Sequence, residues 1–121
     1  MQKNKTLVLG ASESPARYSN LAVNKLIAHG HGVIAVGKTA GAIGDINIET
    51  APMHHDDVDT VTVYLNPQHQ KPYYNYILSL KPRRIIFNPG AENEELAGLA
   101  VEQGINALEA CTLVLLSTGQ Y

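Results

Sequence analysis

The residues best suited to bind a ligand lie in a short segment near the N-terminus. Gly10 follows the apolar run 6–9, the next residue is the small Ala11, and Ser12 and Ser14 carry hydroxyl groups. Glycine permits a sharp turn, a small neighbour lets a ligand approach the main chain, and the N–H groups that open a following helix attract anions. The segment therefore predicts a phosphate-binding turn. The alternative is an ordinary turn in which Ser12 or Ser14 caps the helix.

A second candidate position follows the apolar run 33–36. Sites for NAD usually place an acid there, which binds the ribose hydroxyl groups. Here Val36 is followed by Gly37 and Lys38 instead. A lysine favours a phosphorylated ribose, as found in NADP or coenzyme A, and disfavours NAD. The alternative is a lysine that is merely exposed at the surface.

The other reactive side chains do not form a catalytic pattern. The segment 54–57 reads His-His-Asp-Asp, but two adjacent histidines point in different directions and suit a connecting loop better than a metal site. His29 and His31 flank a glycine at the end of a predicted helix, where partial positive charge is favourable. Cys111 lies in an apolar run, which is typical of a buried, inert thiol. We therefore expect no catalytic residue and no metal ligand.

Short apolar runs alternate with longer amphipathic segments along the whole chain. Runs typical of strands occupy 6–9, 33–36, 61–65, 84–87 and 105–108, with a weaker alternation over 43–49 and a last apolar run at 111–116. Helical spacing extends over about 18–29, 68–80 and 92–103. This order predicts an α/β protein with a doubly wound, mainly parallel sheet of five to six strands and helices on both faces. In such sheets ligands bind where the strands end.

The composition is that of one globular domain, which we expect to span residues 1–121. Apolar residues make up 45% of the 121 residues, charged residues 17%, and the net charge is −2. A mildly acidic chain argues against nucleic-acid binding, and the absence of a long apolar stretch argues against membrane association. A single cysteine suits the reducing cytoplasm. The tyrosines at 73, 74 and 76 predict a helix face packed on the sheet, or a surface for a homodimer or another protein partner.

At this point the order of the motifs resembles a known family. It runs Leu-Val-Leu-Gly-Ala-Ser at 7–12, Ser-Pro-Ala-Arg-Tyr-Ser-Asn at 14–20, His-Gly-His-Gly-Val at 29–33, Val36, Asn-Pro-Gly-Ala-Glu-Asn-Glu-Glu at 88–95, then Gly104 and Cys111. This order is similar to that of the stand-alone CoA-binding domains, which are related to the CoA-binding domain of the succinyl-CoA synthetase α-subunit. The resemblance covers nearly the whole chain and implies a Rossmann-like fold.

The resemblance also implies which residues contact the cofactor. The pyrophosphate would lie against Gly10, Ala11 and Ser12, and the segment just after that turn would lie near the phosphates. The adenosine and its 3′-phosphate would meet the end of the second strand, and the later strand ends would lie beside the cofactor and its pantetheine arm. The residues implied for these later positions are Arg17, Ser19, Asn20, Val36, Gly37, Lys38, Leu65, Asn66, Pro67, Asn88, Pro89 and Gly90.

The chain departs from the family pattern in two places. The family usually has Asn-Pro and then a basic residue after the strand-two valine, whereas this chain has Gly37 and Lys38. The family also tends to have a tryptophan before Pro-Gly, whereas this chain has Phe87 and Asn88. The synthetase passes a phosphate through a histidine of a second domain, for which 121 residues leave no room. We therefore expect a binding module for coenzyme A or an acyl-CoA without turnover. The alternatives are an NADP-type oxidoreductase fragment and an interaction protein that has lost its ligand.

Overall fold

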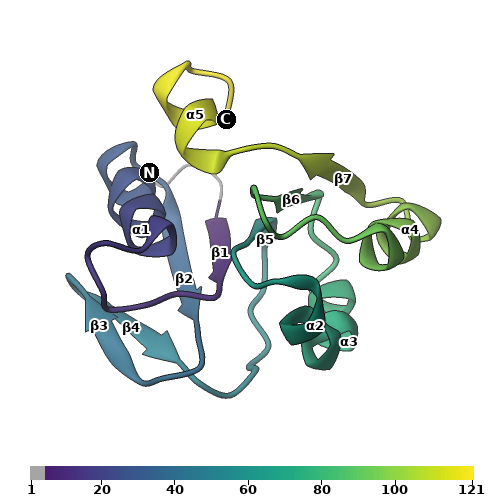
Figure 1. Cartoon of the computed structure of the whole chain (residues 1–121), viewed down its shortest axis with the longest axis horizontal. Helices are drawn as coiled ribbons and strands as arrows, with labels where there is room; N and C mark the ends of the chain where they lie inside the picture. The colour runs from purple at the N-terminus through teal and green to yellow at the C-terminus, as the bar shows by residue number, and fades with distance from the viewer. Residues whose placement is uncertain (1–4) are drawn as a thin grey trace.

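The computed structural model describes residues 5–121 as a seven-stranded sheet with helices on both faces (Figure 1). Its strands lie in the order β3-β4-β2-β1-β5-β6-β7, and only β3 runs antiparallel to its neighbour. The elements are β1 (Lys5–Leu9), α1 (Tyr18–Ala28), β2 (Gly32–Val36), β3 (Gly41–Ile43), β4 (Ile46–Glu49), β5 (Val58–Val63), α2 (Pro67–Gln70), the 3₁₀ helix η1 (Lys71–Tyr73), α3 (Tyr74–Ser79), β6 (Arg84–Phe87), α4 (Glu94–Glu102), β7 (Asn106–Glu109) and α5 (Thr112–Ser117). The predicted doubly wound, mainly parallel α/β fold is confirmed.

Alternate residues of the central strands enter two separate hydrophobic cores, because successive side chains of a strand point to opposite faces of the sheet. On one face Leu7 and Leu9 of β1 join a core that includes residues of α3 and α4. On the other face Val8 joins Leu26 of α1 and Leu116 of α5. The continuous burial of β1, β5 and β6 explains why their sequences are apolar runs rather than alternating patterns.

Three segments differ from the elements that the sequence predicts. The segment 43–49 folds into a β3–β4 hairpin around Gly44, whose φ of 59° favours glycine, and this hairpin raises the number of strands to seven. The single helix predicted over 68–80 is divided into α2, η1 and α3, and Pro72 lies at the division, where it cannot donate a helical hydrogen bond. The apolar run 111–116 is helical and forms most of α5.

The strand order places the reversal of the chain at the centre of the sheet. From β1 the chain crosses to β2 on one side, and it later returns to β5 on the other side of β1. In parallel sheets the loops diverge at such a point and leave a crevice above the carboxyl ends of the strands. The ends of β1, β2 and β5 are therefore where a ligand site is expected. No helix in the described range 5–121 is long and apolar enough to cross a membrane.

Candidate functional site

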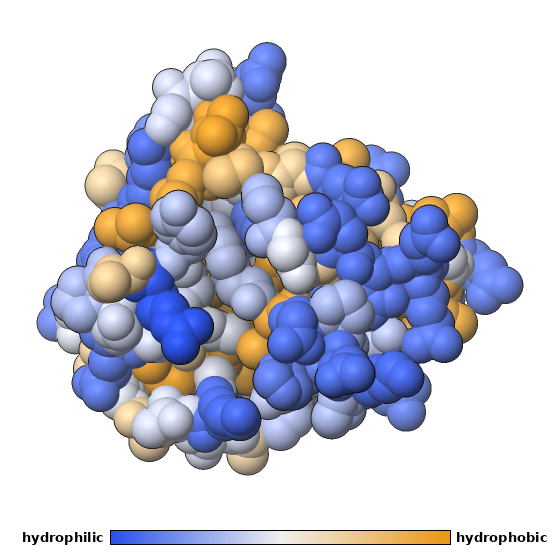
Figure 2. Space-filling view, in the orientation of Figure 1, coloured by the Kyte–Doolittle hydropathy of each residue, from blue (hydrophilic) through white to orange (hydrophobic). Residues whose placement is uncertain are grey.

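A cavity of about 670 Å³ lies above the carboxyl ends of β1, β2 and β5. Three short segments line it: the turn between β1 and α1, the loop after β2, and the segment from the end of β5 through η1. Figure 2 shows this side of the molecule hollowed near its centre, with hydrophilic side chains on either side of the hollow. The lining residues are Gly10, Ala11, Ser12, Glu13, Arg17, Gly37, Lys38, Thr39, Ala40, Leu65, Gln68, His69, Pro72 and Tyr73.

The β1–α1 turn is fastened to the end of β2. Gly10 adopts a φ of 95°, as expected for a glycine that turns the chain sharply. The N–H groups of Gly10 and Ala11 both donate to the carbonyl oxygen of Val36, at 2.8 and 3.0 Å. These two donors are therefore engaged within the protein. An anion would instead meet the later part of the turn, where Ser12 and Arg17 line the cavity.

The later part of the turn is held by two further hydrogen bonds. The Ser12 hydroxyl oxygen accepts from the Ser14 N–H at 3.1 Å, a bond within the turn. Neither serine caps α1, whose N-cap is Arg17 without a side-chain hydrogen bond. The Asn20 side-chain amide donates to the Ser12 carbonyl oxygen at 2.9 Å. Asn20 and the adjacent Ser19 are buried in α1 and do not line the cavity, and Asn20 supports the turn through this hydrogen bond.

Gly37 lies where the β1–α1 turn crosses the end of β2. A Cβ atom at this position would lie 2.3 Å from the Ala11 carbonyl oxygen, far closer than a real Cβ contact. The Gly37 N–H donates to the Glu49 carbonyl oxygen at 3.0 Å, so the main chain there is also fixed from the β4 side. The glycine that departs from the family pattern thus permits the close approach of two loops. Lys38 follows it directly and lines the cavity.

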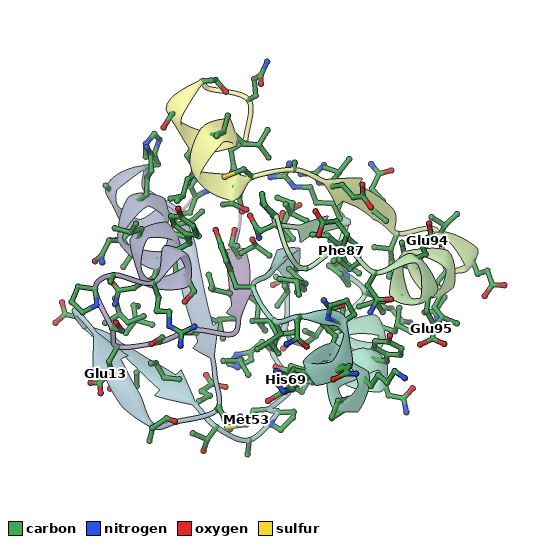
Figure 3. The ribbon with its side chains drawn as sticks, in the orientation of Figure 1. Glu13, Met53, His69, Phe87, Glu94 and Glu95 are labelled. Atoms are coloured by element: carbon green, nitrogen blue, oxygen red, sulfur yellow. The ribbon has the colours of Figure 1, made fainter. Side chains whose placement is uncertain are left out.

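Glu13 brings a carboxylate to the cavity that the sequence interpretation missed. It extends from the β1–α1 turn to β3, where its Oε2 atom accepts a hydrogen bond from the Ala42 N–H at 2.9 Å. Figure 3 shows Glu13 beside β3, whereas His69 lies across the molecule on α2. An added Cβ on Gly41 would lie 2.2 Å from the Glu13 Cδ atom, so Gly41 leaves the space that this carboxyl group fills. No periodicity in the sequence connects residues 13 and 41.

The α2 side of the cavity has its own support. The Asn66 side chain caps α2 by accepting from the His69 N–H at 3.1 Å. The fully buried Gln70 donates from Nε2 to the carbonyl oxygens of Leu65 and Ala91, both at 2.8 Å. The Asn93 amide donates to Gln70 Oε1 at 2.9 Å, which links this wall to the start of α4. These hydrogen bonds hold the segment from α2 through η1 in place, and His69 and Tyr73 of that segment line the cavity.

Of the predicted cofactor contacts, about half line this cavity and the rest lie elsewhere. Val36 is in the core, Asn66 and Pro67 open α2, and Pro89 and Gly90 are exposed after β6. Asn88 is buried and bonded on all sides: its amide donates to the Thr62 hydroxyl and the Val63 carbonyl oxygen, and its Oδ1 accepts from the Thr112 N–H at 2.8 Å. Contact of these residues with a cofactor stays a prediction. Those that line the cavity are Gly10, Ala11, Ser12, Arg17, Gly37, Lys38 and Leu65.

The histidine-rich segment 54–57 is engaged in local pairs. His54 pairs with Asp56 and His55 with Glu49, each at 2.9 Å. Within residues 5–121, no three histidine, cysteine or acidic side chains form a group that could hold a metal ion. The tyrosines 73, 74 and 76 pack against the core on the α3–α4 face, which agrees with a helix face packed on the sheet.

Comparison with known proteins agrees with the family resemblance and with the fold. Residues 4–117 match a family described as a CoA binding domain. An uncharacterized protein of known crystal structure is 49% identical over 100% of both chains, with a TM-score of 0.97. Two archaeal proteins share the fold: a hypothetical protein from Pyrococcus horikoshii OT3 (20% identity, 95% and 82% coverage, TM-score 0.86) and one from Pyrococcus furiosus (23%, 93% and 98%, 0.79). No functionally curated protein matches the sequence.

Proposed function

Because this chain belongs to the CoA-binding domain family, we propose that its cavity binds coenzyme A or an acyl-CoA and that the protein is a non-catalytic binding module. The observation that carries the proposal is the cavity above β1, β2 and β5, in which Arg17 and Lys38 lie near the β1–α1 turn. A cavity of about 670 Å³ is of the size that holds a cofactor.

The charges of the lining suit a ligand with several phosphates. Arg17 approaches from the segment before α1 and Lys38 from the loop after β2, so two cations reach the cavity from different sides. Coenzyme A carries a diphosphate and a separate 3′-phosphate, which these two cations can neutralise separately. The Ser12 hydroxyl adds a neutral donor beside them.

The α2 side suits a part of the ligand that carries no phosphate. Leu65, Pro72 and the ring of Tyr73 give this side an apolar surface, and Tyr73 is half-buried against the core. The pantetheine arm of coenzyme A is less polar than its phosphates and fits this side, while the adenosine and its 3′-phosphate would lie at the end of β2 beside Lys38.

The lining supports binding rather than turnover. Nucleophilic catalysis requires a nucleophile within hydrogen-bonding distance of a base. The Ser12 hydroxyl oxygen accepts from a main-chain N–H instead, and His69 lies on the opposite wall. Cys111 precedes α5 and is not among the lining residues. We therefore expect the purified protein to leave bound acetyl-CoA unchanged.

Calorimetry with coenzyme A and dephospho-CoA tests the proposal. We expect the wild-type protein to prefer coenzyme A by about tenfold, because a charged hydrogen bond contributes about 1.5–3 kcal/mol. Lys38→Gln should remove most of that preference. The matched control is Lys81→Gln, an exposed lysine outside the lining, which should retain it. Absence of heat with millimolar coenzyme A would overturn the proposed function.

A further inference from the structure

Glu13 is the acid among the residues that line the cavity. Glu13 is held at the rim of the cavity by the hydrogen bond from Ala42 and by the space above Gly41. Its position is therefore defined, although the side chain is exposed. A carboxylate at the rim of a polyphosphate site is unfavourable unless it contacts a part of the ligand that carries no phosphate.

The carboxylate is not used to neutralise the neighbouring cations. No ion pair joins Glu13 to Arg17 or Lys38 within the described residues, although all three line the same cavity. Its Oε2 atom accepts from Ala42, and among residues 5–121 its Oε1 atom has no hydrogen-bond donor. An ionised carboxylate accepts hydrogen bonds and donates none. Oε1 lies against Gly41 at the edge of the cavity and retains its capacity to accept a hydrogen bond.

The two loops that carry Glu13 and Lys38 pack closely together at the cavity. Gly37 lies against Ala11, so the turn that carries Glu13 packs on the loop that carries Lys38. One rim of the cavity therefore offers an acceptor from one loop and a cation from the other. A ribose with one free hydroxyl and one phosphate on neighbouring carbons has the complementary pattern.

We propose that Glu13 is a specificity-determining residue that accepts a hydrogen bond from a free ribose 2′-hydroxyl and rejects a 2′-phosphate, while Lys38 binds a 3′-phosphate. The proposal rests on the proposed binding of coenzyme A and extends it. Lys38 by itself favours a phosphorylated ribose of either kind. Glu13 supplies the discrimination, since a 2′-phosphate would face a like charge and would have no proton to donate.

Two isomeric probes test the proposal directly. Adenosine 3′,5′-bisphosphate and adenosine 2′,5′-bisphosphate carry the same charge and differ only in the position of one phosphate. We expect the wild-type protein to prefer the 3′ isomer by about tenfold in calorimetry, the scale typical of one lost hydrogen bond and one repulsion. Glu13→Gln should reduce the preference to about twofold, chiefly by tighter binding of the 2′ isomer.

Two further variants separate specificity from folding. Glu13→Gln retains an oxygen that can accept from Ala42, so its unfolding free energy should equal that of the wild type. Gly41→Ala leaves Glu13 in the sequence but displaces its carboxyl group, and it should likewise reduce the preference for the 3′ isomer. Glu102→Gln removes an exposed acid at the end of α4 and should leave the preference unchanged.

The outcomes distinguish this proposal from the proposed function. Coenzyme A binding together with equal affinity for the two isomers would overturn the role of Glu13 and leave the proposed function standing. The role of Glu13 would also be overturned if Glu13→Gln kept the full preference for the 3′ isomer, or if it changed the affinity for both isomers equally. Failure of the wild type to bind coenzyme A would overturn the proposed function itself.

Discussion

The end of β2 carries a glycine whose α-carbon faces the main chain of the β1–α1 turn. The distance of 2.3 Å between a built Cβ on Gly37 and the Ala11 carbonyl oxygen leaves no space for a side chain. The contact is with main chain, which cannot rotate away as a flexible side chain can. The shape of the cavity at this point therefore depends on the absence of a single carbon atom.

Gly37→Ala should destabilise the protein and weaken ligand binding together. We expect a loss of about 1–3 kcal/mol in the unfolding free energy measured by urea denaturation, the usual cost of overpacking. The control is Gly98→Ala in α4, where an added Cβ has nothing within 4 Å. The unfolding free energy of that variant should rise by about 0.5–1 kcal/mol, because alanine is a better helix former than glycine. Equal stability of the two variants would contradict the close contact.

The buried hydroxyl of Tyr64 should make the protein less stable in alkaline solution. This hydroxyl is buried beside the hydroxyls of Thr62 and Thr112, which bond to each other at 2.7 Å. Burial raises the pKa of Tyr64 from 10.0 to about 12. The folded state thus holds this proton more tightly than the unfolded chain, and the associated stability is present below pH 10 and is lost as the pH rises through 12.

Tyr64→Phe should make the unfolding free energy less dependent on pH between 10 and 12. Denaturant titrations at several pH values measure this slope, and absorbance at the tyrosinate wavelength should lose one late-titrating group. Tyr121 also has a raised pKa, because of its burial, so part of the alkaline slope should persist. An unchanged slope would show that Tyr64 titrates normally.

The loop after β6 is joined to two other elements by one buried side chain, Asn88. Asn88 donates to Thr62 and Val63 of β5 at 2.6 and 2.9 Å and accepts from the first residue of α5 at 2.8 Å. The side-chain amide after β6 therefore joins the neighbouring strand β5 to the start of α5. Gln70 and Asn93 join α2 to α4 in the same manner. These buried amides fix the helices that surround the sheet.

Asn88→Ala should lower the unfolding free energy by about 2–4 kcal/mol, since it leaves the buried Thr112 N–H without an acceptor and removes the amide donor to the Thr62 hydroxyl. Asn106→Ala, at an exposed position of β7, should change it by no more than about 0.5 kcal/mol. Urea denaturation measures both. Since Asn88 does not line the cavity, coenzyme A affinity of the folded variant should stay within about twofold of the wild type.

At the scale of the whole molecule, Tyr121 closes the face of the sheet that α1 and α5 cover. Its ring lies 4.4 Å below the Arg84 guanidinium carbon and 4.9 Å from the His31 ring, and its hydroxyl is bonded to the Thr6 hydroxyl. Arg84 is buried, and its Nε donates to the Thr60 hydroxyl at 2.9 Å. The aromatic ring thus covers a buried cation that has no carboxylate within ion-pairing distance among the described residues.

Tyr121→Ala should destabilise the protein by about 2–3 kcal/mol, because it removes an aromatic contact and leaves Arg84 poorly covered. Gln120→Ala, at the exposed neighbouring position, is the control and should have little effect. Thermal unfolding followed by circular dichroism compares the two. Equal melting temperatures for both variants would contradict a stabilising role for Tyr121.

The path of the chain was largely predictable because buried parallel strands require continuous apolar residues, and these are visible at 6–9, 33–36, 61–65 and 84–87. The turn at Gly10 to Ser12 and the lysine at 38 were found for a similar reason, since they directly follow such runs. The fragmented helix over 67–79 was not found. Its apolar residues keep a helical spacing through Pro72, so the spacing alone did not reveal that this proline divides the segment.

The sequence by itself thus determined the fold class, the family and the strand ends where a ligand is expected, because local residue types govern strands, turns and the order of elements. Only the tertiary structure decided which residues share the cavity. It brought Glu13 from the first turn to Gly41 and Ala42, and it directed Asn88 into the interior. These contacts join residues far apart in the chain, so they depend on how the strands are ordered in space, which no local pattern encodes.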